Sequence, residues 1–211
     1  MLQRVPIMRN FGGHTMLGAN QFLVSKSAFP EGWLRERRNG VTATQVAKAA
    51  TPAGFEQAVR DYQLNLIEPD NEFMRFGREM EPVIARILHQ KFDVLPNDWL
   101  IRSDKNPHHL ATPDGLSLDH TVCAEIKTSS KDFEHSMIPA QYRRQVQWQL
   151  HVTGAERCLF AWMQRIEVDG VFASAWFEPK TLWIERDEGM IEALIDTADR
   201  LWERVQSEQE G

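Results

Sequence analysis

The chain has 211 residues, of which 42% are hydrophobic and 26% are charged, and its formal net charge is −6. This composition is typical of a soluble globular protein, and the acidic balance excludes a surface coated in basic residues, so a nucleic acid would have to be held locally. No apolar run is long enough to span a membrane, the first twenty residues lack an apolar signal segment, and the two cysteines have no zinc-site spacing. We therefore expect a cytoplasmic protein.

The N-terminal part of the chain contains its densest basic cluster. Residues 1–20 are predicted to form an irregular arm, and residues 21–29 a short apolar segment. Residues 31–40 (EGWLRERRNG) are the basic cluster and end in a predicted turn, after which Thr42 or Thr44 can cap a helix. Arginines just ahead of a helix N-terminus make a phosphate site, because guanidinium groups and free backbone N–H groups converge there. The alternative, which composition alone favours, is a solvated turn with an ordinary cap.

Two helices are predicted next, over residues 52–67 and residues 73–88, because their apolar positions recur at helical spacing. Pro82 interrupts the second and predicts a kink or a fresh helix start. Glu81 falls within, or at the edge of, the apolar stripe. A buried carboxylate is costly unless it is paired or bound to metal, whereas an exposed first-turn glutamate would only favour the helix dipole. The pattern leaves both interpretations of Glu81 open.

The clearest chemical pattern joins a turn to a strand. Asp114 lies in a Pro-Asp-Gly turn, and a predicted strand over residues 122–127 carries Glu125, Ile126 and Lys127. Because side chains alternate along a strand, Glu125 and Lys127 share one face and Ile126 points to the other. Two carboxylates and a backbone carbonyl suit Mg²⁺ or Mn²⁺ and suit zinc poorly. Taken alone, these residues are more typical of a turn and a solvated strand face with a weak ion pair.

A glutamine-rich helix is predicted over residues 140–152, with Gln141, Gln145 and Gln149 in one polar stripe. Such a stripe is either plain solvent-facing surface or a row of amides for a scissile phosphate or a metal-bound water. The order of elements predicts a single α/β (α+β) domain over residues 1–211, with a central mixed sheet flanked by helices. The remaining predictions are strands at residues 94–102, 108–112 and 158–163, a loop at 133–139, a hairpin at Asp169-Gly170, a terminal helix at 187–206, and loop positions rather than ligand roles for His108, His109 and His120.

Four blocks, in order along residues 33–163, resemble the lambda exonuclease and YqaJ-like family of phage recombination nucleases, within the PD-(D/E)xK superfamily. They are GWLRERRNGVTATQV, FGREMEPVIARIL, ATPDGL with AEIK, and YRRQVQWQLHVTGAERCLFAWM. The resemblance implies a restriction-endonuclease-like core and a Mg²⁺-dependent 5′→3′ exonuclease of double-stranded DNA that releases 5′-mononucleotides and leaves 3′ single strands for recombination. It also implies one or two ions per site, a ring-shaped homotrimer on DNA ends, and a single-strand annealing protein as partner in a bacterial host.

The resemblance assigns metal-site roles residue by residue. Asp114 and Glu125 would be the metal-binding carboxylates, with the backbone carbonyl of Ile126 as a further ligand. Lys127 would position or help to activate the attacking water. Glu81 would reach the metal directly or through water.

The resemblance also assigns a nucleophile-orienting residue and a phosphate pocket. Gln145 would orient the nucleophile or the scissile phosphate, and Thr44 would hold the terminal 5′-phosphate together with Arg37 or Arg38. Spacing to the Thr-Ala-Thr turn favours Arg37, but Arg38 is equally basic. Two other functions stay open: a structure-specific endonuclease or resolvase on the same core, and a noncatalytic protein that binds DNA ends.

Overall fold

The structure is a computed structural model that describes residues 21–64, 70–133 and 138–209. The arm predicted over residues 1–20 lies outside the described residues, and none of the helices within them is both long and apolar enough to cross a membrane. The strands are β1 (Gln21–Ser25), β2 (Val41–Thr42), β3 (Val94–Pro96), β4 (Trp99–Arg102), β5 (His109–Ala111), β6 (Gly115–Ser117), β7 (Val122–Ser129), β8 (Arg157–Val168), β9 (Val171–Ser174) and β10 (Lys180–Glu185). The helices are α1 (Pro30–Glu36), the 3₁₀ helix η1 (Arg37–Asn39), α2 (Ala43–Ala49), α3 (Pro52–Gln63), α4 (Glu72–Phe92), α5 (Ala140–Thr153) and α6 (Glu188–Gln209).

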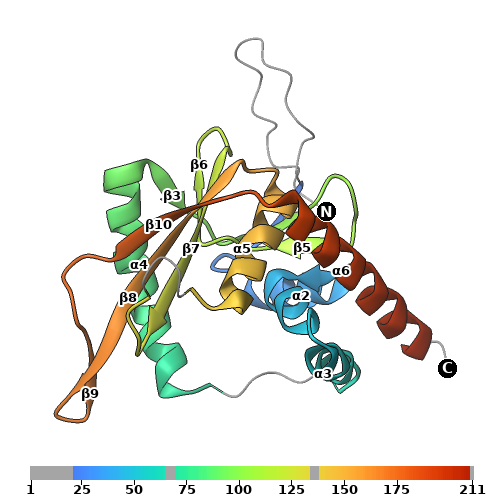
Figure 1. The fold of residues 1–211 in the computed structure, drawn as a ribbon, viewed down its shortest axis with the longest axis horizontal. Helices are drawn as coiled ribbons and strands as arrows, with labels where there is room; N and C mark the ends of the chain where they lie inside the picture. Colours follow the sequence, from blue (N-terminus) through green and yellow to red (C-terminus); the bar gives the residue numbers. More distant parts are fainter. Residues whose placement is uncertain (1–20, 65–69, 134–137, 210–211) are drawn as a thin grey trace.

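The strands form two sheets, and the larger one contains the long strands β7 and β8 (Figure 1). Its order is β10-β8-β7-β6-β3, with β9 paired to β8, and only β7 and β8 run parallel. The smaller sheet has the order β1-β4-β5-β2, with only β2 and β5 parallel. The predicted mixed α/β class is confirmed, but the single predicted sheet is divided in two. Pro113 lies between β5 and β6 and has no N–H to continue a ladder across that join.

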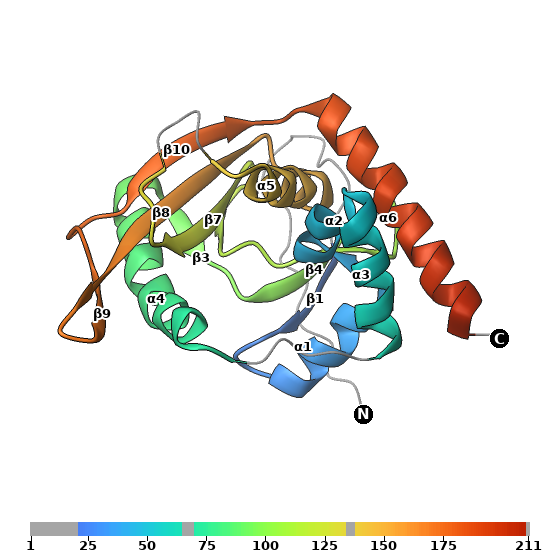
Figure 2. The ribbon, with the colours of Figure 1, turned by 60° about the horizontal axis from the view of Figure 1, so that its bottom comes forward.

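The two faces of β7 pack against different helices. Ala124 and Ile126 contact the side of α4 that carries Ile84, whereas Cys123 belongs to the core cluster that includes α5 and α6. Glu125 lies on the Cys123 face, where a side chain of α5 hydrogen-bonds to it. The predicted alternation around Ile126 is therefore confirmed. Figure 2 shows α4 and α5 on opposite sides of the pair formed by β7 and β8.

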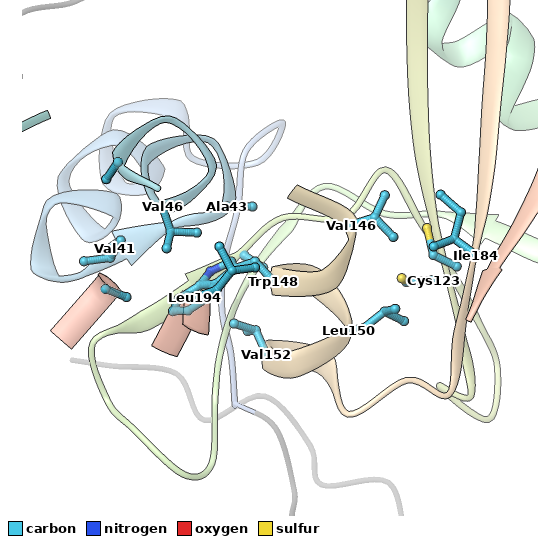
Figure 3. Close-up of a cluster of buried hydrophobic side chains, with 14 of the residues drawn as sticks. Val41, Ala43, Val46, Cys123, Val146, Trp148, Leu150, Val152, Ile184 and Leu194 are labelled. Carbon is cyan, nitrogen blue, oxygen red and sulfur yellow. The ribbon is translucent and has the colours of Figure 1, made fainter. Parts of the chain in front are cut away.

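Helix α5 is buried along its second half and lies at the centre of the main core. Figure 3 shows Trp148 and Val152 directed toward α2 and α6, and Val146 and Leu150 directed toward the large sheet. The indole N–H of Trp148 donates a hydrogen bond of 3.0 Å to the backbone carbonyl of Leu110. This contact and the packing on both sides fix the rotation of α5 about its own axis, which decides where its glutamines point.

The basic cluster is mostly helical. Pro30 occupies the first turn of α1, where a missing backbone N–H costs nothing, and η1 then carries Arg37 and Arg38 to Gly40. Of the two cap candidates, Thr42 is the N-cap of α2 and forms a capping box with Gln45.

The expectation of a fresh helix start at Pro82 is wrong. Helix α4 runs without a break from Glu72 to Phe92, and Pro82 lies inside it. Both halves of the helix have buried residues, including Phe76 before the proline and Ile84 after it. Packing on the sheet therefore offsets the hydrogen bond that Pro82 cannot donate.

The expectation that His109 is a loop residue is also wrong. His109 lies in β5 with only 2% of its surface exposed, and its ring nitrogens lie 2.9 Å from His151 Nε2 and 3.0 Å from Asp199 Oδ1. The strand predicted over residues 108–112, which includes His109, is confirmed as β5. The predicted hairpin is confirmed, since Asp169 and Gly170 both have positive φ, 51° and 76°, as a two-residue turn of this kind requires.

Candidate active site

The pairing of β6 with β7 brings the two predicted metal-binding carboxylates together. Gly115 lies opposite Ala124, so the antiparallel register, continued by one residue, places Asp114 beside Glu125. The Ile126 N–H donates a hydrogen bond of 2.7 Å to Asp114 Oδ2, and the Asp114 N–H donates one of 2.9 Å to the Ala124 carbonyl. A Cβ atom on Gly115 would lie 2.8 Å from Val94, which is why glycine follows the aspartate. The Asp-Gly step therefore presents an acid beside β7 and is not a solvated turn.

Glu125 is buried, and each of its carboxylate oxygens has a cationic or amide neighbour. Only 1% of its side chain is exposed. The Lys127 ammonium forms an ion pair with Oε1, and the Gln149 side-chain amide donates a hydrogen bond of 2.6 Å to Oε2. Lys127 also lies 5.4 Å from the ring centroid of Tyr142. A solvated strand face with a weak ion pair is thus excluded by burial.

The buried site formed by Asp114, Glu125 and Lys127 has a surplus of negative charge. Burial raises the pKa of Asp114 well above its usual value, the carboxylates of Glu125 and Glu81 raise it further, and Lys127 counteracts them only in part. Burial by itself would lower the pKa of Lys127, but Glu125 and Asp114 outweigh that effect and raise it. Without a bound cation, Lys127 is therefore a protonated hydrogen-bond donor at neutral pH.

The carboxylates fit a hard divalent cation. A second positive charge beside Lys127 would relieve the repulsion that raises the pKa of Asp114. No group of three or more His, Cys, Asp and Glu side chains arranged to hold a metal occurs in the described part of the chain. Mg²⁺ does not need one, because it is commonly bound through one or two carboxylates and keeps several waters. Asp114, Glu125 and the Ile126 carbonyl are the oxygen atoms that would hold such an ion.

Two of the predicted phosphate-binding residues, Arg37 and Thr44, line the same cavity as Asp114. Arg37 stacks on the Trp33 ring, with 4.4 Å between the guanidinium carbon and the ring centroid, and burial lowers the pKa of Arg37. Thr44, in the first turn of α2, lines the cavity beside it. Lys26 is a second cation there, 5.3 Å from the same ring. Arg38 is exposed and does not line the cavity.

One cavity of about 170 Å³ joins these two groups. Asp114, Glu81 and Gln145 line this cavity together with Arg37 and Thr44. Glu125 and Lys127 do not line the cavity. Glu125 accepts a hydrogen bond from Gln149, which does line it, and both residues interact electrostatically with Asp114. The structure thus brings together every predicted site residue except Arg38.

Sequence reasoning missed several residues of this cavity. Gln149 was visible only as the third member of the glutamine stripe, and its burial depends on the rotation of α5. Lys26 and Asn97 had no signal, because both come from segments brought in by the small sheet. Thr112, two residues before Asp114, lines the cavity, and its buried hydroxyl lacks a hydrogen-bond partner within the described residues.

Residues 32–156 match the family model of the YqaJ-like viral recombinase domain. A search of curated proteins found no match. Among solved structures, the chain is similar to an alkaline exonuclease (LHK-Exo) from Laribacter hongkongensis, with 23% identity, a TM-score of 0.70, and coverage of 85% of this chain and 94% of that one. LHK-Exo in complex with dAMP matches with 22% identity, a TM-score of 0.67 and the same coverage. A phage-related exonuclease from Haemophilus somnus 129PT matches with 12% identity, a TM-score of 0.61, and coverage of 81% and 96%.

Proposed function

This chain belongs to the YqaJ-like viral recombinase domain family, and on that premise we propose that it is a Mg²⁺-dependent 5′→3′ exonuclease of double-stranded DNA. The observation that supports this function best is that one cavity is lined both by the carboxylates Asp114 and Glu81 and by Arg37 and Thr44. A nuclease needs the acids near the scissile phosphate, and an end-dependent enzyme also needs a cationic site for the terminal phosphate. The two lie in one small cavity, which favours removal of one nucleotide at a time.

In the proposed hydrolysis, three carboxylates and one lysine have separate roles. A bound divalent cation, with Mn²⁺ able to replace Mg²⁺ and one or two ions per site, would supply an activated water and charge stabilisation at the phosphate. Asp114 and Glu125, with the Ile126 carbonyl, would hold that cation, and Glu81 would reach it directly or through water. Lys127, kept protonated by its carboxylate neighbours, would donate a hydrogen bond to the attacking water or to a phosphate oxygen.

The direction of digestion follows from what the cavity would hold. Water attacks the phosphorus and the bond to the 3′ oxygen breaks, so the released nucleotide keeps its 5′-phosphate and the shortened strand begins with a new one. That new end carries the group that Arg37 and Thr44 would bind. Gln145, which lines the same cavity as Asp114, would orient the nucleophile or the scissile phosphate. The dAMP bound to LHK-Exo is a nucleoside monophosphate, the class of product proposed here.

The family also supports proposals about assembly and partners. We propose a ring-shaped homotrimer that encircles duplex DNA, and a single-strand annealing protein that takes up the 3′ strand in phage-type recombination. Mass measurement in solution tests the first, and co-purification of this chain with a single-strand annealing protein tests the second.

The test of the proposed function is digestion of linear, 5′-phosphorylated duplex DNA beside a closed circular duplex, in Mg²⁺ and in EDTA. We expect loss of the linear DNA only, only with Mg²⁺, with mononucleotides and single strands as products. Cutting of the circle would identify an endonuclease instead. Metal-independent binding without cleavage in Mg²⁺ or Mn²⁺ would identify a protein that only binds DNA ends.

A further inference from the structure

Helix α5 carries a glutamine at every second position from 145 to 149, and these three side chains have different surroundings. Gln145 and Gln149 are one helical turn apart and both line the cavity. Gln147 lies between them in the sequence and points elsewhere: its amide donates to the Glu185 carbonyl at 2.8 Å and accepts from the Asp187 N–H at 2.8 Å. Both ends of Gln147 are therefore satisfied by backbone groups, as expected of a structural side chain.

Gln149 is as buried as Gln147 but is only half satisfied. Its exposed fraction is 1%, and its amide nitrogen donates the 2.6 Å hydrogen bond to Glu125 Oε2. Its amide oxygen is buried and has no hydrogen-bond partner within the described residues. A buried amide carbonyl without a partner is costly, and native structures rarely leave one unsatisfied without a ligand or an ordered water.

The chemistry of the cavity limits what that partner can be. An amide oxygen accepts hydrogen bonds and coordinates cations, so phosphate and carboxylate oxygens, which are acceptors too, cannot satisfy it. The acidic wall formed by Asp114 and Glu81 favours the same class of ligand, a cation or a water polarised by one. The buried Thr112 hydroxyl also lines the cavity and has no partner within the described part of the chain, and it can accept a hydrogen bond from a water there.

We propose that Gln149 is a positioning residue that links Glu125 to a water of the bound divalent cation. Its amide nitrogen fixes the Glu125 carboxylate in the orientation that also allows the ion pair with Lys127. Its amide oxygen would accept a hydrogen bond from a water that enters with the cation. This inference rests on the proposed nuclease function. It gives Gln149 a different role from Gln145, which would contact the nucleophile or the scissile phosphate.

The test uses Gln149→Met, which keeps the side-chain length and removes both amide groups, with Gln147→Met as the matched control on the same helix. Ca²⁺ binding to the metal-free full chain is measured by calorimetry, which needs no turnover. We expect Gln149→Met to bind Ca²⁺ about 10–100-fold more weakly, in the range typical when a group that orients a metal ligand is removed. Its kcat should fall while its KM for DNA ends stays near the wild-type value. Gln147→Met should lower the Tm and leave the Ca²⁺ affinity unchanged.

Two outcomes would overturn the inference. One is wild-type Ca²⁺ affinity and wild-type kcat in folded Gln149→Met. The other is unfolding of both Gln149→Met and the shorter Gln149→Asn, which would show that Gln149 acts only in packing. If the wild-type protein binds Ca²⁺ but does not cleave DNA, the nuclease function is refuted. The role of Gln149 in cation binding is then still decided by the Ca²⁺ affinity of Gln149→Met.

Discussion

Replacing Lys127 by methionine tests both the chemistry and the electrostatics of the acidic wall. Lys127→Met keeps the volume of the side chain and removes the charge that balances Asp114 and Glu125. Removing one partner of a buried ion pair costs about 3–5 kcal/mol, and the lower figure applies here because Glu125 keeps its hydrogen bond to Gln149. For a chain of this size, about 3 kcal/mol corresponds to a fall in Tm of roughly 6–12 °C.

The assay is thermal unfolding in EDTA, followed by the same measurement in Ca²⁺. We expect the deficit of Lys127→Met to shrink when Ca²⁺ is added, because the cation replaces the missing positive charge. Turnover in Mg²⁺ should fall by about 10²–10³, the loss typical when one preorganised donor is removed, with little change in binding of 5′-phosphorylated duplex. Lys180→Met is the control, because the Lys180–Asp132 ion pair is exposed and worth at most about 1 kcal/mol. An unchanged Tm in EDTA, or near-normal turnover, would refute the proposed role of Lys127.

Other perturbations address the remaining titratable and cationic groups. Burial and the neighbouring carboxylates raise the pKa of Asp114, so ionising this group in the folded protein lowers the stability as pH rises toward that pKa. Asp114→Asn should therefore raise the metal-free Tm by a few degrees at pH 8 and lose that gain as pH falls toward 4. It should also abolish the rise in Tm with Ca²⁺. Burial lowers the pKa of His151 to about 4. The unfolded chain therefore takes up a proton below pH 6.5 that the folded protein resists, and the free energy of unfolding falls as pH falls from 6.5 toward 4. The full difference of roughly 2.5 pH units is worth about 3 kcal/mol, and urea unfolding at pH 7 and pH 4.5 should show a smaller loss in His151→Gln than in the wild type. Arg37→Ala should lose the preference for 5′-phosphorylated over 5′-hydroxyl ends, whereas Arg38→Ala should keep it; retention by both would place the terminal phosphate elsewhere.

The elements that sequence reasoning predicted well have local causes. Val122 to Lys127 reads as a strand because its apolar side chains are β-branched or small, and the alternation around Ile126 follows from strand geometry wherever the strand lies. The Asp169-Gly170 turn and the Thr42 cap depend on the same few residues that form them. By contrast, helix α4 continues through Pro82 because of the sheet beneath it, and no local pattern reports that packing.

By itself, the sequence determined which residue types could do the chemistry: an acid before a glycine, the Glu-Ile-Lys strand and the arginines ahead of a capped helix. Only the tertiary structure decided which of them meet. The register of β6 on β7 places Asp114 beside Glu125, and its side chain accepts a hydrogen bond from the Ile126 N–H. Arg37 stacks on Trp33 and lines the cavity, whereas the equally basic Arg38 does not. The packing of α5 turns Gln149 inward. The physical reason is that burial sets the energy of a charge or an amide, and burial depends on segments that are distant in the chain.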